Sequence, residues 1–119
     1  MFEFDLLQHV FKSNADLSGA VTIPPGDDMG GVMIGDQLVL VTVDQVADGV
    51  HVDVSNTSLE KVGRKALTRN LSDVAAMAVK PVAAVAAASL PRDFGQANAR
   101  SLFESMRVTA ACFDCPLIG

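Results

Sequence analysis

The sequence has 119 residues, of which 50% are apolar, and carries a formal net charge of −5. This length and composition predict one folded domain with a modest core and argue against disorder. The acidic balance and the lack of a basic patch exclude a nucleic-acid-binding surface, and the longest apolar run, residues 82–90, is too short to span a membrane. Because the first residues include acids where a secretory signal has basic residues, we expect a soluble, cytoplasmic protein.

The first half of the chain predicts a helix followed by strands. Apolar residues at helical spacing over residues 2–11 predict a short amphipathic helix that stops at Ser13 and Asn14. Gly35 and Asp36 are typical of a tight hairpin between two strands. Four short apolar stretches are predicted to be strands: residues 21–23, 31–34, 37–43 and 50–52.

The second half predicts two long helices. Residues 57–60 have the form of a capping box, and an apolar stripe follows that predicts a helix ending before Pro81. Residues 94–113 predict a second amphipathic helix. Residues 82–89 are interpreted as a buried strand despite their many alanines, and residues 116–119 as the start of another strand.

This order of elements predicts a single domain over residues 1–119. Its class is α+β (α/β), with a mixed β-sheet that is covered by helices on one face. The sequence contains a lone C-x-x-C, Cys112 and Cys115, which could be a redox pair or half of a zinc site. Because no second pair completes four ligands, we expect both cysteines to be inert small hydrophobic residues.

Acidic residues are few, yet several lie where predicted elements meet loops. Asp27 and Asp28 follow a Pro-Pro-Gly turn. Asp44 ends a predicted strand, and Asp73 lies beside the apolar stripe of the first long helix. Magnesium prefers hard oxygen ligands, so carboxylates from separate segments could hold a phosphate-bound ion. Asp27 and Asp28 could instead be ordinary turn residues, and a buried Asp73 could be satisfied by either a metal or a hydrogen-bond donor.

Two further polar features have both a structural and a functional interpretation. His51, in a short apolar strand, is more often a structural residue than a ligand. Lys61, Lys65 and Arg69 recur every four residues on the first long helix. Such a row could meet a substrate phosphate but is more typical of a solvated helix face.

Five short blocks follow one another along the chain: Gly26-Asp27-Asp28, Thr42-Val43-Asp44, Asp48-Gly49-Val50-His51, Gly63-Arg64-Lys65-Ala66-Leu67 and Asn70-Leu71-Ser72-Asp73-Val74-Ala75-Ala76-Met77. Together they resemble the amino-terminal domain of the thiamine-monophosphate kinase family, within the superfamily of aminoimidazole ribonucleotide synthetase. The resemblance runs from about Phe4 to Gly119, and the N-L-S-D embedded in a helix is its most specific part. The chain departs from the family pattern at residues 29–31, Val43 and Ala78.

The resemblance implies ATP-dependent phosphorylation of thiamine monophosphate to thiamine diphosphate, with Mg²⁺ bridging the phosphates. It implies a set of metal ligands: Asp28, Thr42, Val43 through its backbone carbonyl, Asp44 and Asp73, with Asp27 beside them. It also implies that His51 contacts the thiamine-phosphate substrate. No covalent catalytic residue is expected, because phosphoryl transfer asks mainly for positioning and charge neutralisation.

The same resemblance implies a homodimer in which the sheets of two amino-terminal domains pair at their edges. In the family a carboxy-terminal domain covers the nucleotide, and we expect that domain to be absent from this chain and the isolated chain to be inactive. Two alternatives stay open. One is a related ATP-dependent enzyme, of the hydrogenase-maturation, selenophosphate synthetase or aminoimidazole ribonucleotide synthetase type. The other is a non-catalytic dimerisation or nucleotide-sensing module.

Overall fold

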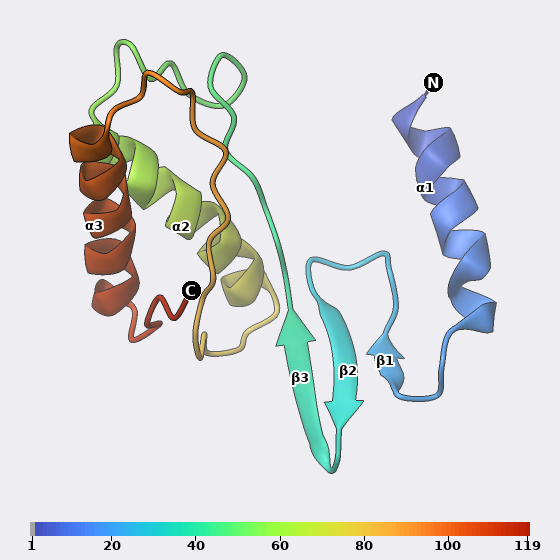
Figure 1. Ribbon diagram of the computed structural model, residues 1–119. Helices are drawn as coiled ribbons and strands as arrows, with labels where there is room; N and C mark the ends of the chain where they lie inside the picture. The colour runs from blue at the N-terminus through green and yellow to red at the C-terminus, as the bar shows by residue number, and fades with distance from the viewer. Residues whose placement is uncertain (1) are drawn as a thin grey trace. The chain divides into compact units, whose positions relative to one another are not determined.

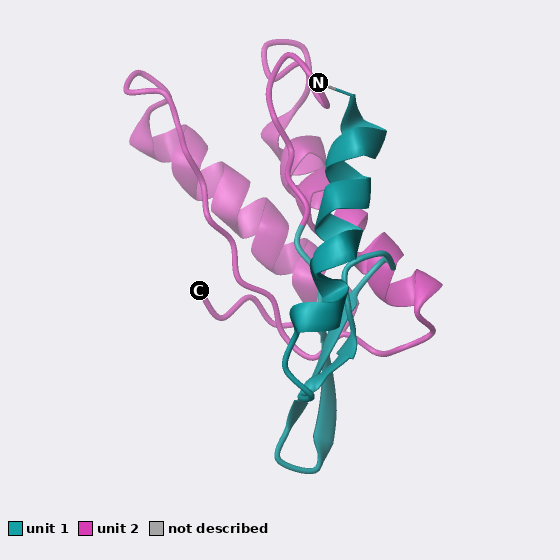
Figure 2. Cartoon of the chain, turned by 90° about the vertical axis from the view of Figure 1, so that its right-hand side faces the viewer, with its two compact units in different colours: residues 1–43 teal, residues 44–119 magenta. Residues whose placement is uncertain are grey.

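A computed structural model describes residues 2–119 and divides the chain into two units, one ending at Val43 and the other beginning at Asp44 (Figure 2). The elements follow in the order helix, three strands and two helices, with a short 3-10 helix after the first helix (Figure 1). The predicted α+β class is therefore confirmed. None of the helices within residues 2–119 is long and apolar enough to cross a membrane.

The first unit opens with helix α1, Glu3–Lys12. Its acids lie in the first turn and its basic residues in the last turn, which suits the helix dipole. The helix ends where predicted, and the hydroxyl of Ser13 donates a hydrogen bond to the carbonyl of Val10 at 2.7 Å. A 3-10 helix, Ser13–Asp16, then leads toward the sheet.

The sheet of the first unit has three antiparallel strands in the order β1-β2-β3. Strands β2, Gly30–Ile34, and β3, Gln37–Val41, form the expected hairpin, in which Ile34 pairs with Gln37. Gly35 in the turn has a φ of 62°, a conformation that glycine adopts without strain. Strand β1, Val21–Ile23, pairs with β2 through an irregular register. The third strand ends two residues before the predicted limit of Val43.

The second unit is built on helices α2, Leu59–Ala76, and α3, Gln96–Cys112, which pack against each other (Figure 1). Their core contains Leu67, Met106 and Ala110. The two helices approach closely at Gly63, because a Cβ added there would lie 2.5 Å from the hydroxyl oxygen of Ser105. Both predicted long helices are therefore confirmed.

Helix α2 begins with a side-chain cap. The hydroxyl of Ser58, the second residue of the predicted capping box, accepts a hydrogen bond from the backbone N–H of Lys61 at 3.4 Å. At the other end the helix stops at Ala76, and Ala78 takes a left-handed conformation with a φ of 55° before Pro81 is reached. Capping by Ser58 satisfies one of the backbone N–H groups that a helix start leaves unpaired.

Three predicted strands of the second unit are not regular strands. Residues 50–52 lie in a turn closed by a single bridge between Asp48 and Val52. Residues 82–89 and 116–119 do run side by side, but only one parallel bridge joins them, between Ala84 and Leu117. Backbone hydrogen bonds to residues 116–119 involve only Ala84 and Ala86, so residues 82–89 are not paired along their length and the prediction of a regular strand was wrong.

Candidate functional site

The six predicted metal ligands are divided between the two units. Asp27, Asp28, Thr42 and Val43 belong to the first unit, whereas Asp44 and Asp73 belong to the second. Within residues 2–119, no three His, Cys, Asp or Glu side chains are gathered so that they could hold a metal ion. The metal site therefore stays a prediction, and each group of ligands is described within its own unit.

In the first unit, Asp27 and Asp28 lie in the turn between β1 and β2, and both are exposed. Oδ1 of Asp27 accepts a hydrogen bond from the backbone N–H of Asp28 at 2.9 Å, so Asp27 has a role in the turn itself. The side-chain amide of Asn14 donates to the carbonyl of Pro25 at 3.0 Å and ties this turn to the 3-10 helix. The acidic pair is thus presented to solvent on a turn that its own unit holds in place.

Thr42 and Val43 follow the last residue of β3. Thr42 is half-buried, whereas the Val43 side chain is 90% exposed. A valine side chain offers no ligand atom, so the carbonyl is the only group through which Val43 can act as a hard oxygen ligand.

In the second unit, Asp44 forms a bidentate ion pair with Arg69 of α2. Nε of Arg69 lies 2.8 Å from Oδ2 of Asp44, and Nη2 of Arg69 lies 3.0 Å from Oδ1. Oδ1 also accepts a hydrogen bond from the backbone N–H of Gln45 at 2.7 Å. Both side chains of the pair are partly buried, with exposed fractions of 34% for Arg69 and 26% for Asp44.

These contacts favour the ionised form of Asp44. The hydrogen bond from Arg69 and then the one from the Gln45 backbone hold the pKa of Asp44 below its usual value, against a smaller opposing effect of desolvation. The positive charge of Arg69 lowers this pKa further. A carboxylate that is charged at neutral pH is the form that either a guanidinium or a metal cation attracts.

The loop that contains His51 is fixed by three kinds of contact. Nδ1 of His51 accepts a hydrogen bond from the backbone N–H of Ala47 at 3.0 Å. The ammonium group of Lys65 on α2 donates to the backbone carbonyl of His51. Oδ1 of Asp48 accepts hydrogen bonds from the backbone N–H groups of Gly49 at 3.0 Å and Val54 at 2.9 Å. Because Nδ1 of His51 is an acceptor, the neutral ring carries its proton on Nε2.

Asp73 lies on α2 and is half-buried, as expected from its place beside the apolar stripe. Its neighbour Val74 is among the buried apolar residues of this unit. The side-chain amide of Asn70, one turn earlier, donates to the carbonyl of Ala66 at 3.0 Å and is therefore engaged with its own helix. Asp73 and Arg69 share helix α2, on which the specific N-L-S-D block lies.

Arg69 is a candidate site residue that the sequence did not identify. Its spacing with Lys61 and Lys65 is typical of a solvated helix face. In the structure Arg69 is half-buried and paired with Asp44, and Lys65 donates a hydrogen bond to the backbone carbonyl of His51. Asp44 and Arg69 are 25 positions apart, so no local pattern connects them. The one local feature that could have identified Arg69 is its position directly before Asn70, the first residue of the N-L-S-D block.

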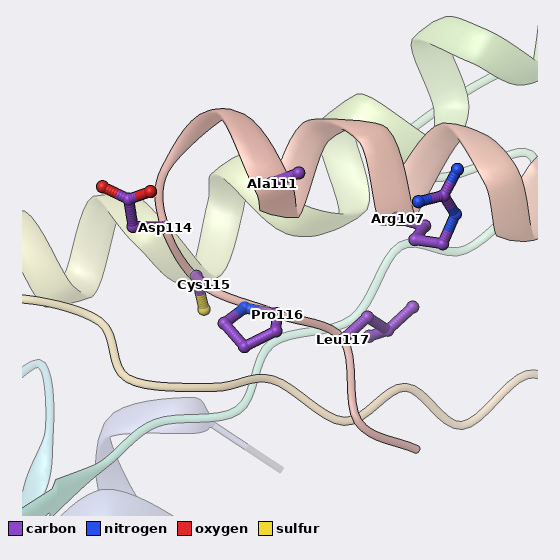
Figure 3. A pocket seen from close by; sticks show the side chains of 6 residues that line it. All are labelled: Arg107, Ala111, Asp114, Cys115, Pro116 and Leu117. Atoms are coloured by element: carbon purple, nitrogen blue, oxygen red, sulfur yellow. The ribbon is translucent and has the colours of Figure 1, made fainter.

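A separate cavity of about 430 Å³ lies at the carboxyl end of α3 (Figure 3). Six residues line it: Arg107, Ala111, Asp114, Cys115, Pro116 and Leu117. Cys115 is buried, and desolvation raises the pKa of its thiol, whereas Cys112 is exposed. Both thiols are free. None of the predicted metal or substrate residues lines this cavity, and burial disfavours the reactive thiolate form of Cys115.

Comparison with known proteins gives one family. Residues 26–119 match the family model described as "AIR synthase related protein, N-terminal domain". The chain is similar to thiamine-monophosphate kinases from Synechococcus elongatus, with 34% identity over 71% of this chain and 26% of that protein. It is also similar to the thiamine-monophosphate kinase from Bacillus subtilis, with 31% identity over 100% of this chain and 37% of that protein. With the one from Mycobacterium tuberculosis it shares 29% identity over 98% of this chain and 35% of that protein.

No solved structure gives a significant match to the chain. The chain spans 26% to 37% of the length of these three curated relatives, so its similarity concerns one part of each of them.

Proposed function

Because the chain belongs to the AIR synthase related family, through its N-terminal domain, we propose that it is the amino-terminal part of a thiamine-monophosphate kinase. The proposed reaction is transfer of the terminal phosphoryl group of ATP to thiamine monophosphate, which gives thiamine diphosphate. The observation that carries this proposal is the similarity along the whole chain to proteins of that name. In this proposal the present chain is the metal-binding and dimerising half.

The proposed metal is Mg²⁺, and its proposed ligands are Asp27, Asp28, Thr42, the carbonyl of Val43, Asp44 and Asp73. Their donor atoms fit this ion, because carboxylate, hydroxyl and carbonyl oxygens are the hard ligands that Mg²⁺ prefers. When bound, the ion would neutralise the charge on the ATP phosphates.

His51 is the proposed contact to the substrate phosphate. The hydrogen bond from the Ala47 N–H to Nδ1 fixes the neutral ring in the form that carries its proton on Nε2. A ring held in this way presents Nε2–H as a donor to a phosphate oxygen. Lys65 supports this geometry from α2 by holding the backbone carbonyl of the same residue.

A cytoplasmic homodimer is also part of the proposal. Strand β3 lies at an edge of the three-stranded sheet, and an edge strand presents unpaired backbone groups that a second sheet can pair with. The exposed fractions of Ile34 and Val41, 62% and 59%, leave apolar surface on these strands that pairing would cover. Sedimentation of the chain and of an Ile34→Lys variant tests this part, because the charge should shift the dimer toward monomer. A monomeric parent chain would refute it.

Calorimetric titration with Mg²⁺ and ATP tests the proposed site directly. We expect the chain to bind the Mg²⁺–ATP complex, and Asp73→Asn and Asp28→Asn to weaken that binding by about tenfold or more, since one charged ligand is worth at least about 1.4 kcal/mol. Asp93→Asn, an exposed position outside the predicted ligand set, is the matched control for lost charge. Absence of binding at millimolar ligand, or equal loss in the control, would refute the site.

The reaction itself is tested by thiamine diphosphate formation in the protein expressed from its own gene. Separation of thiamine phosphates by chromatography after incubation with ATP, Mg²⁺ and thiamine monophosphate gives the direct readout. Nucleotide binding without product formation would favour the non-catalytic nucleotide-sensing module over the kinase.

A further inference from the structure

The carboxylate of Asp44, a proposed metal ligand, is already occupied by a cation of the chain itself. Arg69 places Nε 2.8 Å from Oδ2 and Nη2 3.0 Å from Oδ1, so each oxygen accepts a charged hydrogen bond. Oδ1 also accepts the backbone N–H of Gln45 at 2.7 Å. A carboxylate offers about four lone-pair positions, and these three donors therefore take most of its capacity.

The position of Arg69 is set by the core of the second unit. Leu67, two residues earlier on α2, is 6% exposed and packs with Met106 and Ala110 of α3. From this fixed helix, Lys65 and Arg69 reach the segment that precedes it: Lys65 binds the carbonyl of His51, and Arg69 binds Asp44. The bidentate geometry and partial burial of the Asp44–Arg69 pair distinguish it from a mobile surface ion pair.

We propose that the guanidinium of Arg69 competes with the metal ion for the carboxylate of Asp44. In this role Arg69 is a positioning residue, which holds the carboxylate until a metal ion displaces the guanidinium. This inference rests on the proposed function, in which Asp44 is a Mg²⁺ ligand. A Mg²⁺ ion needs an oxygen at about 2.0–2.1 Å, and both oxygens are engaged by the guanidinium. One lone-pair position is left, on Oδ2, and a metal ion there brings a second cation to a carboxylate that Arg69 already neutralises. Repulsion between the two cations weakens the hydrogen bonds from Arg69 and lowers the affinity for the metal ion.

Measurement of Mn²⁺ binding by electron paramagnetic resonance tests the competition without nucleotide and without catalysis. Arg69→Met removes the guanidinium and keeps an apolar side chain of similar length. Loss of any positive charge raises the affinity for cations, so Arg64→Met, an exposed arginine of the same helix, is the matched control. We expect Arg69→Met to bind Mn²⁺ about two- to fivefold more tightly than Arg64→Met, the range that a partly exposed ion pair supports.

Two negative outcomes are distinguishable. Equal Mn²⁺ affinity in Arg69→Met and Arg64→Met overturns the competition and leaves the proposed metal site standing. Absence of Mn²⁺ binding in the parent chain and in both variants overturns the metal site, and the competition with it. Circular dichroism establishes that each variant is folded before its affinity is compared.

The parent chain provides a second readout that does not depend on any variant folding. The arginine Nε–H groups give separate signals in ¹⁵N nuclear magnetic resonance, and the Nε–H of Arg69 is hydrogen-bonded to Asp44. We expect this signal to shift as Mg²⁺ is added and to reach the chemical shift of a solvated guanidinium at saturation. An unchanged signal at saturating Mg²⁺ overturns the proposal.

Discussion

Substitution of Gly63 by alanine tests how closely α2 and α3 pack, and with it the position of the helix that carries Arg69 and Asp73. The added Cβ would lie 2.5 Å from Oγ of Ser105, 2.8 Å from its Cβ and 3.0 Å from the carbonyl oxygen of Leu102. Non-bonded carbon atoms are normally about 3.5–4.0 Å apart. Ser105 cannot simply rotate away, because its hydroxyl donates to the carbonyl of Glu60 at 2.6 Å.

The expected change in the free energy of unfolding follows from three effects. Alanine is a better helix former than glycine by about 0.8–1.0 kcal/mol, which favours the variant. Overpacking costs about 1–3 kcal/mol, and loss of the Ser105–Glu60 hydrogen bond costs about 0.5–1.5 kcal/mol. The net expectation for Gly63→Ala is a destabilisation of about 0.5–3.7 kcal/mol.

Urea unfolding followed by far-ultraviolet circular dichroism measures this change, because the chain contains no Trp or Tyr for fluorescence. Ser105→Gly removes the two closest contacts of the added Cβ and completes a double-mutant cycle with Gly63→Ala. We expect Gly63→Ala to cost about 1–2 kcal/mol less in the Ser105→Gly background. A Gly63→Ala chain that is as stable as the parent, or more stable, would show that helix propensity outweighs the contact and that the close approach is not as described.

Other substitutions give independent measurements by the same unfolding assay. Leu67→Ala should lower the free energy of unfolding by about 2–5 kcal/mol, because this side chain is 6% exposed in the core. Ser58→Ala should cost about 0.5–2 kcal/mol and Thr57→Ala clearly less, since Ser58 accepts the capping hydrogen bond; the reverse order would contradict the cap. The difference in free energy of unfolding between the parent and Arg69→Met should be constant at pH values above the usual Asp pKa of 3.8. It should shrink below that pH, because Asp44 has a lowered pKa in the folded chain and loses its pairing with Arg69 when it is protonated. A difference that does not change with pH would contradict the pairing.

The long helices were predictable from the sequence because their evidence is local and repeated. Residues 57–78 carry an apolar stripe over many turns with a cap in front and a proline behind, and α2 follows as Leu59–Ala76. The hairpin was predictable for the same reason, since the turn residues lie between two short apolar stretches. By contrast, residues 82–89 form a strand only if a partner pairs along their length, and a single bridge joins them to residues 116–119.

The candidate site also has a part that is predictable from local sequence and a part that depends on tertiary structure. Aspartates at element ends can be read from the sequence because their positions relative to helices and strands are local properties. The pairing of Asp44 with Arg69 depends on where α2 lies relative to a segment 25 positions earlier, which periodicity cannot supply. Lys65 was missed for the same reason, because its partner is a backbone carbonyl in a loop whose path is set by tertiary contacts.

The described carboxylates therefore differ in what a metal ion must displace. Asp27 uses one oxygen for a neutral backbone N–H at 2.9 Å and is exposed, so a cation that binds its other oxygen displaces only water. Asp44 has a guanidinium on both oxygens and a backbone N–H on one of them. Since a charge-assisted hydrogen bond is about twice as strong as a neutral one, Asp44 is the ligand whose contribution to metal binding depends most on a neighbouring side chain. Arg69→Met removes donors from Asp44 alone, because the hydrogen bond of Asp27 comes from the backbone of Asp28. A change in metal affinity in this variant therefore reports on Asp44.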